Sequence, residues 1–221
     1  MSNDNPLEDI FGLGDHTLLT AKNSLNEPIT SRSFVNYWIA APQASSDFWA
    51  MAGWDGDDFI QGTDAAENEI HGFGGDDKMY SYKGDDMIFA DAGSDILSSG
   101  LGDDTLEGGD GNDSLFGAKG DDILRGGQGD DLLMGGPGIN TLAGGQGADR
   151  FALLKSAENL IFDFDPFGGD QLLVRSKDMA KLKILPQGSS FILDFGQSTT
   201  NIFSRKLLTT DDIMDAIILR R

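Results

Sequence analysis

Residues 72–152 read GFGGDDKMY SYKGDDMIF ADAGSDILS SGLGDDTLE GGDGNDSLF GAKGDDILR GGQGDDLLM GGPGINTLA GGQGADRFA, which is nine nonapeptides in direct succession. In all nine units the fourth residue is glycine and the eighth is large and apolar; the sixth is aspartate in eight, with Asn140 the exception. An upstream copy, GWDGDDFIQ, begins at Gly53, and an irregular ten-residue unit, GTDAAENEIH, separates it from the array. Three columns that recur together at one period indicate a repeat architecture.

The three columns predict the structure of one unit. Glycine permits positive φ and close approach of chains, as a tight turn requires. Aspartate supplies a hard carboxylate oxygen, the ligand type that calcium prefers. The apolar eighth residue points inward from a short strand while its two neighbours point outward, because strand side chains alternate. Each nonapeptide is therefore half a coil, and stacked coils form a solenoid stabilised by contacts between neighbours.

The charge distribution requires an offsetting cation, since without one the segment is expected to stay disordered. The 221-residue chain has a net charge of −21, and residues 53–152 hold 22 acidic and 5 basic residues, which is −17 of that total, together with 24 of the 30 glycines. Such a segment repels itself when compact. A polyanion of this kind is an unsuitable partner for nucleic acid, whose phosphates attract basic surfaces. The absence of cysteine excludes disulfides and thiolate metal sites.

These repeats resemble the RTX family, whose nonapeptide GGxGxDxUx forms a parallel β-roll. The resemblance implies an all-β fold, a calcium-loaded roll over residues 53–152 with a partly helical N-terminal cap (1–52) and a C-terminal β cap that ends in a helix (153–221). It also implies calcium between turns on each side of the roll. Turns on one side come from every second repeat, so facing aspartates are expected 18 residues apart.

The resemblance implies a definite set of calcium sites, about six in number with a range of four to eight. Six pairs fit the spacing: Asp77/Asp95, Asp86/Asp104, Asp95/Asp113, Asp104/Asp122, Asp113/Asp131 and Asp131/Asp149. Asp122/Asn140 is a seventh, weakened by the loss of one charge, and Asp58/Asp77 an eighth, doubtful because the ten-residue unit breaks the register. The remaining ligands implied are turn carbonyls at places such as Gly109, Gly111, Gly127 and Gly129. Fifth-place aspartates such as Asp103 and Asp121 are expected to face solvent.

The flanks carry weaker signals. A helix is expected near Ser31–Ile39, and Trp38, Trp49 and Trp54 form either part of a cap or a ligand groove. After the array, strands are expected at 160–164, 171–174, 182–185, 191–195 and 201–203, separated by Gly and Pro turns. Asp163, Asp165 and Asp170 are candidates for one more calcium ion. Residues 207–221 are expected to form an amphipathic helix capped by Thr209 or Thr210.

The outward strand positions hold more apolar side chains than a solvated solenoid needs. One sheet is expected to present Tyr80, Ile96, Phe116, Leu132 and Met134, and the other Met87, Phe89 and Ile123. A contiguous apolar patch marks an interaction site. This face is therefore expected to be covered by a terminal segment or to bind a partner.

Export and function follow from these features as expectations. The N-terminus lacks the basic and apolar regions of a Sec signal, and no apolar run is long enough to span a membrane. The final segment resembles in position the C-terminal signal of type I secretion, which predicts a protein secreted from, or on the surface of, a Gram-negative-type bacterium. HExxH and GxSxG motifs are absent, so we expect no enzyme. A structural or surface-interaction role is favoured, with self-association possible; the alternatives are a polysaccharide-binding module, as in alginate epimerases, and a part of a secreted enzyme.

Overall fold

The computed structural model describes residues 38–40, 48–62, 64, 67–154, 156–187, 190–196, 198–204 and 206–220. Most of the expected N-terminal helix, and the side chains of Trp38 and Trp49, lie outside the described residues. Where the expected helix enters them it is wrong, because Trp38–Ala40 is strand β1, paired antiparallel with β2. Aromatic and β-branched residues such as Trp38 and Ile39 suit a pleated strand.

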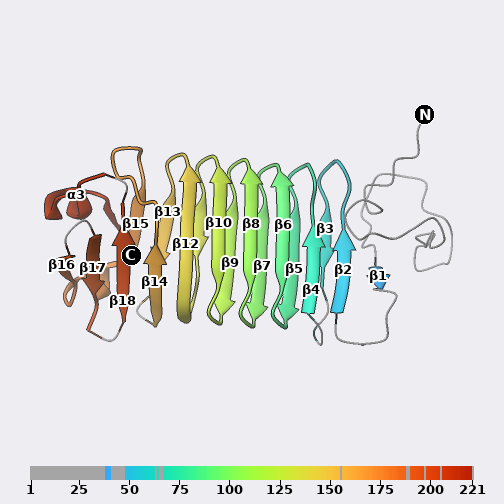
Figure 1. The fold of residues 1–221 in the computed structure, drawn as a ribbon, viewed down its shortest axis with the longest axis horizontal. Coiled ribbons are helices and arrows are strands. Elements are labelled where there is room, and N and C mark those ends of the chain that lie inside the picture. The colour runs from blue at the N-terminus through green and yellow to red at the C-terminus, as the bar shows by residue number, and fades with distance from the viewer. Residues whose placement is uncertain are drawn as a thin grey trace.

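The array forms a two-sheet roll, seen from the side in Figure 1. One sheet has eleven strands, in the spatial order β1 (Trp38–Ala40), β2 (Phe48–Ala52), β4 (Glu67–His71), β6 (Met87–Ala92), β8 (Thr105–Asp110), β10 (Ile123–Gln128), β12 (Gly138–Gln146), β14 (Ala157–Ile161), β18 (Thr199–Phe203), β17 (Ser190–Asp194) and β16 (Lys183–Gln187). The other has eight, in the order β19 (Ile217–Arg220), β15 (Gln171–Arg175), β13 (Arg150–Leu153), β11 (Leu132–Met134), β9 (Ser114–Lys119), β7 (Ile96–Leu101), β5 (Lys78–Lys83) and β3 (Phe59–Gln61). The chain thus alternates between sheets, and the predicted parallel β-roll is confirmed.

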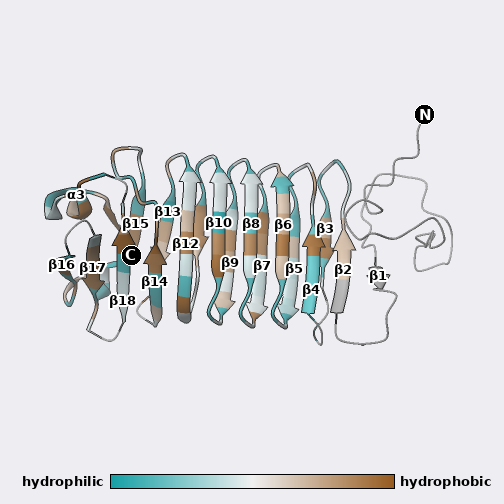
Figure 2. Cartoon of the chain, in the orientation of Figure 1, coloured by the Kyte–Doolittle hydropathy of each residue, from teal (hydrophilic) through white to brown (hydrophobic). Residues whose placement is uncertain are grey.

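The core is a stack of the eighth-place residues. Leu106 pairs with Leu124, and Leu124 with Leu142, each in parallel register on neighbouring strands. All nine eighth-place side chains are fully buried, and the apolar colour runs along the middle of the strands (Figure 2). Burying a Leu, Ile or Phe side chain contributes about 1.5–3 kcal/mol. The hydrophobic column therefore holds the coils together, while the turns between the sheets carry the charge.

The turns need glycine because the turns of successive coils on one edge are stacked too closely to leave room for a Cβ. Gly111 has φ +136°, and a Cβ there would overlap the carbonyl oxygen of Gly93 in the preceding coil. The second place of the repeat also adopts positive φ, although four units place a non-glycine residue there: Phe73, Tyr82, Asp91 and Ala118. A side chain at positive φ costs roughly 1–2 kcal/mol. These four turns hold a strain that the rest of the roll must offset.

Both sheets continue past residue 152 into a C-terminal β region. β14 and β15 extend the roll in parallel, and β16, β17 and β18 form an antiparallel meander beside it. A short helix α2 (Ser176–Met179) follows β15. The division of the chain at residues 52 and 152 remains a prediction.

The chain end differs from the expected helix. Helix α3 covers only Thr210–Asp215, with Thr209 as its N-cap in a capping box with Asp212. Residues Ile217–Arg220 then form β19, which pairs in parallel with β15. The continuous helix to the end of the chain was therefore wrong. The run Ile217–Leu219 is apolar and partly β-branched, and β15 offers it an open sheet edge. No helix in the described part of the chain is long and apolar enough to cross a bilayer.

Candidate metal sites along the edges of the roll

The sixth-place residues form two rows, one along each edge of the roll. Edge 1 consists of the turns that lead into the eight-stranded sheet, and edge 2 of those that lead into the eleven-stranded sheet. Edge 1 carries Asp58, Asp77, Asp95, Asp113, Asp131, Asp149 and Asp170. Edge 2 carries Asn68, Asp86, Asp104, Asp122, Asn140 and Asn159. All six pairs with 18-residue spacing are brought together in this way.

One hydrogen bond repeats along both rows. From Asp58 to Asp170 on edge 1, and from Asn68 to Asn140 on edge 2, the backbone N–H of each member donates to Oδ1 of the next, at 2.7–3.1 Å. The N–H of Asp95, for example, donates to Oδ1 of Asp113 at 2.8 Å, and Asp113 does the same to Asp131. This bond fixes the rotamer of each carboxylate and leaves its second oxygen in the interval between coils.

The second oxygens lack partners. Oδ2 is buried without a hydrogen bond in seven of these residues: Asp77, Asp86, Asp95, Asp104, Asp113, Asp122 and Asp131. A buried charged oxygen without a partner carries a large desolvation cost. Rows of such oxygens are hard anionic donors that a divalent cation would satisfy, and calcium prefers this donor type. The described residues thus fit the metal that the sequence implied.

Turn carbonyls supply further oxygens. A Cβ on residue 127 would overlap the carbonyl oxygen of Gly109, and one on residue 129 that of Gly111. These carbonyls therefore point along the roll toward the next coil on the same edge. Among the described residues no group of three acidic or histidine side chains could hold a metal. An ion here would be held by two carboxylates together with carbonyls of the kind at Gly109, Gly111, Gly127 and Gly129.

Burial changes the acidity of the rows. It raises the pKa of Asp77, Asp122 and Asp131 to about 7, and that of Asp95, Asp104, Asp113 and Asp149 to about 6, from an ordinary value of 3.8. Neighbouring carboxylates in the same row add to the rise for Asp77 and Asp131. Without a cation, the folded roll holds these groups charged at pH 7 only at an energetic cost.

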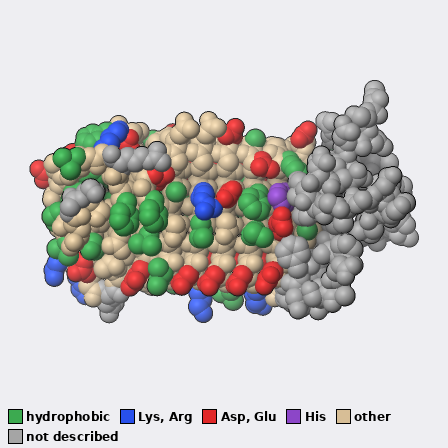
Figure 3. Space-filling model, viewed as in Figure 1, with side chains coloured by type: hydrophobic (Ala, Val, Ile, Leu, Met, Phe, Trp, Pro, Cys, Tyr) green, Lys and Arg blue, Asp and Glu red, His purple; other side chains and the backbone are tan. Residues whose placement is uncertain are grey.

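The fifth-place aspartates belong to two separate, exposed rows, one on each edge of the roll. Oδ1 of Asp85 accepts from the N–H of Asp103 at 2.9 Å, and Oδ1 of Asp103 from the N–H of Asp121 at 2.8 Å. Asp76, Asp85, Asp103, Asp121 and Asp130 are all exposed, as expected. Figure 3 shows acidic side chains lined up along one side of the roll. These carboxylates raise the negative potential around the buried rows.

A comparison with models of protein families identifies the type of repeat in the array. The model described as RTX calcium-binding nonapeptide repeat (4 copies) matches residues 53–88, 71–106, 98–133 and 125–152. Residues 53–152 are RTX calcium-binding repeats. Among solved structures, the chain is similar to the extracellular lipase LipA from Serratia marcescens, with 17% identity and a TM-score of 0.37, over 78% of this chain and 42% of the lipase. The chain thus spans less than half the length of that lipase. A comparison with curated proteins found no match.

The two rows of sixth-place residues extend beyond the repeats that keep the nine-residue period. Asp58 keeps its place although 19 residues separate it from Asp77, because its N–H reaches Oδ1 of Asp77 at 2.8 Å. Asn68, Asn159 and Asp170 were missed as row members, since they lie outside the registered repeats. Each nevertheless precedes a buried apolar residue by two positions, Ile70, Ile161 and Leu172, as in the regular units. Counting backward from the apolar residue would have found all three.

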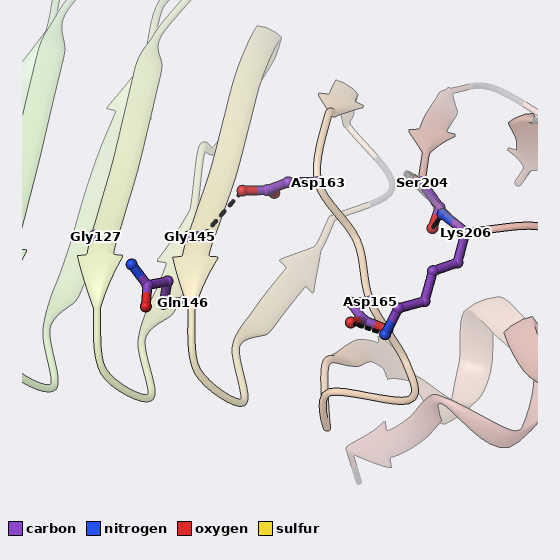
Figure 4. A pocket seen from close by; sticks show the side chains of 7 residues that line it. All are labelled: Gly127, Gly145, Gln146, Asp163, Asp165, Ser204 and Lys206. Atoms are coloured by element: carbon purple, nitrogen blue, oxygen red, sulfur yellow. Dashed lines mark hydrogen bonds and ion pairs between the residues drawn. The ribbon is translucent and has the colours of Figure 1, made fainter.

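Asp163, Asp165 and Asp170 do not form the joint calcium site considered from the sequence. Asp170 belongs to the edge 1 row, and Asp163 accepts hydrogen bonds from the backbone N–H groups of Gly144 and Gly145 at 3.1 and 2.9 Å. Asp165 forms an ion pair with Lys206, which lowers the pKa of the carboxyl. Asp163, Asp165 and Lys206 line a pocket of about 380 Å³ at the end of the RTX array (Figure 4). Backbone N–H groups are thus the partners of Asp163, and Lys206 is that of Asp165, while Oδ2 of Asp170 accepts from the N–H of Asp165 at 2.7 Å.

The raised pKa values predict a pH effect in the absence of calcium. Between the ordinary pKa of 3.8 and the folded values of about 6–7, the folded roll binds more protons than the unfolded chain. Stability of the calcium-free roll must then increase as pH falls through this window and decrease as pH rises through it. In excess chelator, we expect far-UV circular dichroism to show β structure increasing from about pH 7.5 to about pH 5. Loss of β structure over the same interval would contradict the buried, unpaired carboxylates.

Proposed function

We propose that this chain is an extracellular calcium-binding protein whose RTX array folds when calcium enters the two rows. The observation that carries the proposal is the set of seven buried Oδ2 atoms without partners, arranged in rows beside turn carbonyls. Calcium would supply the positive charge that a chain with a net charge of −21 lacks. Metal binding is then coupled to folding, because the sites do not exist in the unfolded chain.

The proposal includes export by a type I secretion apparatus from a Gram-negative-type bacterium. Extracellular modules with low calcium affinity bind the ion at concentrations of about 10⁻⁴–10⁻³ M. A chain with such sites stays unfolded at lower calcium, as passage through an exporter requires, and folds on reaching calcium outside. The proposal assigns no catalytic step, since the sequence carries no catalytic motif.

Export can be tested directly. The full chain is expressed in a host with and without a type I exporter, and the medium is assayed for the protein. We expect export only with the exporter, and retention when residues 207–221 are removed. Equal export of the shortened chain would contradict a secretion signal in this segment, and no export of either would overturn the type I route.

The exposed apolar residues support a surface-interaction role. Phe162 and Phe203 stack with ring centroids 5.2 Å apart and are 49% and 38% exposed. Ile139 is 53% exposed. Stacked aromatic rings at the surface suit contact with another macromolecule. Sedimentation velocity in calcium should show self-association that weakens when Phe162 and Phe203 are both replaced by serine, if a second copy is the partner.

Polysaccharide binding is a second candidate, supported by one described residue. Trp54 is 47% exposed beside the start of the roll. An exposed indole ring suits stacking on a sugar. A glycan array with the calcium-loaded chain and Trp54→Ala tests it: hits that this substitution abolishes would favour the module, and an array without hits would exclude the glycans tested.

A further inference from the structure

The first place of the repeat faces the interval between two turns. A Cβ on Gly117 would lie 2.3 Å from Oδ2 of Asp122 in its own turn and 2.8 Å from the carbonyl oxygen of Gly135 in the next coil on edge 2. The same two contacts, with the equivalent aspartate and carbonyl, recur at Gly53, Gly72, Gly108 and Gly126. A side chain at this place therefore points at the second carboxylate oxygen of its turn.

Three units carry a side chain at the first place, and two of these side chains are hydroxyls. The residues are Ser81, Ala90 and Ser99, and all three are fully buried. Oγ of Ser81 donates to the carbonyl oxygen of Ser99 at 3.1 Å, and Oγ of Ser99 donates to that of Gly117 at 2.8 Å. Each hydroxyl thus reaches from its own coil to the next coil on edge 2.

The two hydroxyls lie in intervals in which aspartates pair. Ser81 lies in the interval of Asp86 and Asp104, and Ser99 lies in that of Asp104 and Asp122. On edge 1 the first place is glycine or alanine in every unit. The first-place side chains of edge 1 therefore offer no oxygen to the intervals on that edge.

One proton cannot satisfy both oxygens that each hydroxyl faces. A hydroxyl has one proton and two lone pairs, and Ser99 gives its proton to the Gly117 carbonyl. Burial raises the pKa of Asp104 to about 6, and the nearby Ser99 hydroxyl is among the groups that oppose this rise. Oδ2 of Asp104 nevertheless has no hydrogen-bond partner. Oγ and Oδ2 are therefore neighbouring oxygens without a proton between them, and Ser81 and Asp86 repeat the arrangement.

We infer that the hydroxyl oxygens of Ser81 and Ser99 are calcium ligands, in the Asp86/Asp104 and Asp104/Asp122 sites respectively. The inference rests on the proposed calcium binding of the array. Calcium takes about six to eight oxygen ligands, and a hydroxyl oxygen is a hard, neutral donor of that kind. The bond to the next carbonyl holds each oxygen in place and leaves its lone pairs free for the cation. These two sites thus gain a side-chain oxygen that the sites of edge 1 lack.

The test replaces Ser99 with cysteine in the full-length chain, which contains no cysteine of its own. A thiolate is a soft ligand and favours soft metals over calcium. Cadmium, a soft divalent ion close to calcium in size, is the probe, because its bond to a thiolate gives an ultraviolet charge-transfer band. In calcium, one equivalent of cadmium should produce this band in Ser99→Cys and displace one calcium ion. The band should weaken as the calcium concentration is raised.

Ser98→Cys is the matched control for the cadmium experiment. Ser98 is the neighbouring residue on β7, and the alternation of strand side chains turns it to the outer face of the sheet. The control places the same thiol away from the edge 2 interval. One equivalent of cadmium should therefore give no band with which calcium competes.

The outcomes separate the inference from the proposed function. No band in a folded Ser99→Cys chain, or equal bands in the two variants, would overturn the inference. If Ser99→Cys fails to fold in calcium, Ser99→Ala decides, since Ala90 shows that alanine fits the first place. This variant should bind one ion at least about tenfold more weakly, the loss typical even for a group that only supports a metal ligand, and an unchanged calcium isotherm would overturn the inference. A wild-type chain that binds no calcium would instead overturn the proposed function.

Discussion

Replacing Gly111 with alanine is expected to open the middle of the roll and to raise the calcium concentration needed for folding at least tenfold. The new Cβ would overlap the carbonyl oxygen of Gly93, and the residue would have to keep φ +136°. The backbone conformation alone costs roughly 1–2 kcal/mol. Relief of the overlap must move two coils apart, which displaces carbonyls on edge 1. The measurement is the calcium midpoint of the circular dichroism signal.

Gly56→Ala is the matched control for this variant. Gly56 has φ +123°, but a Cβ there has no heavy atom within 4 Å. It therefore carries the same backbone cost without the overlap, and we expect a midpoint shift several times smaller. Equal shifts in the two variants would mean that close stacking of the coils does not limit folding.

Replacing Asp113 with alanine is expected to remove up to two calcium ions and to destabilise the calcium-loaded chain by about 3 kcal/mol or more. Asp113 belongs to two pairs, with Asp95 and with Asp131, and its Oδ1 accepts from the N–H of Asp95 at 2.8 Å. An unsatisfied buried N–H costs about 1–3 kcal/mol, and the loss of bound ions adds to this. Thermal unfolding at fixed calcium, with the calcium count, measures both effects.

Asp121→Ala is the control for the Asp113 variant. Oδ1 of Asp121 accepts an equivalent bond, from the N–H of Ile139 at 2.7 Å, but the residue is exposed at the fifth place. We expect no ion to be lost and a change in stability below about 1 kcal/mol. If both variants lost the same number of ions, the buried rows would not be the calcium sites.

The period of the repeats predicts the roll well because one physical rule governs each column. Leu106, Leu124 and Leu142 have to stack once alternate units share a sheet, and the sixth-place aspartates follow the same register. The rule fails where the spacing changes. Asp170 lies 21 residues after Asp149, yet its Oδ1 accepts from the Asp149 N–H at 2.9 Å, because the longer turn absorbs the insertion. Strand register, not residue count, decides membership of a row.

The chain end shows a second limit of sequence reasoning. The pattern at Thr209–Asp212 correctly indicates a helix start, because capping is local. The segment Ile217–Arg220 satisfies a helical pattern equally well, and only the open edge of β15 makes it a strand. Likewise, the amide of Asn140 donates to the carbonyl oxygen of Gly136, a contact that no spacing reveals.

The most direct test of calcium-coupled folding is hydrogen exchange of the full chain in excess chelator and in millimolar calcium. Calcium should protect the amides of β5 to β12 and of the turns between them, where the N–H groups of Asp95 and Asp113 donate to the next row member. In chelator at neutral pH the same amides should exchange at the rate of an unfolded chain. Equal protection of these strands in chelator would contradict the account, because the buried carboxylates would then be stable without a cation.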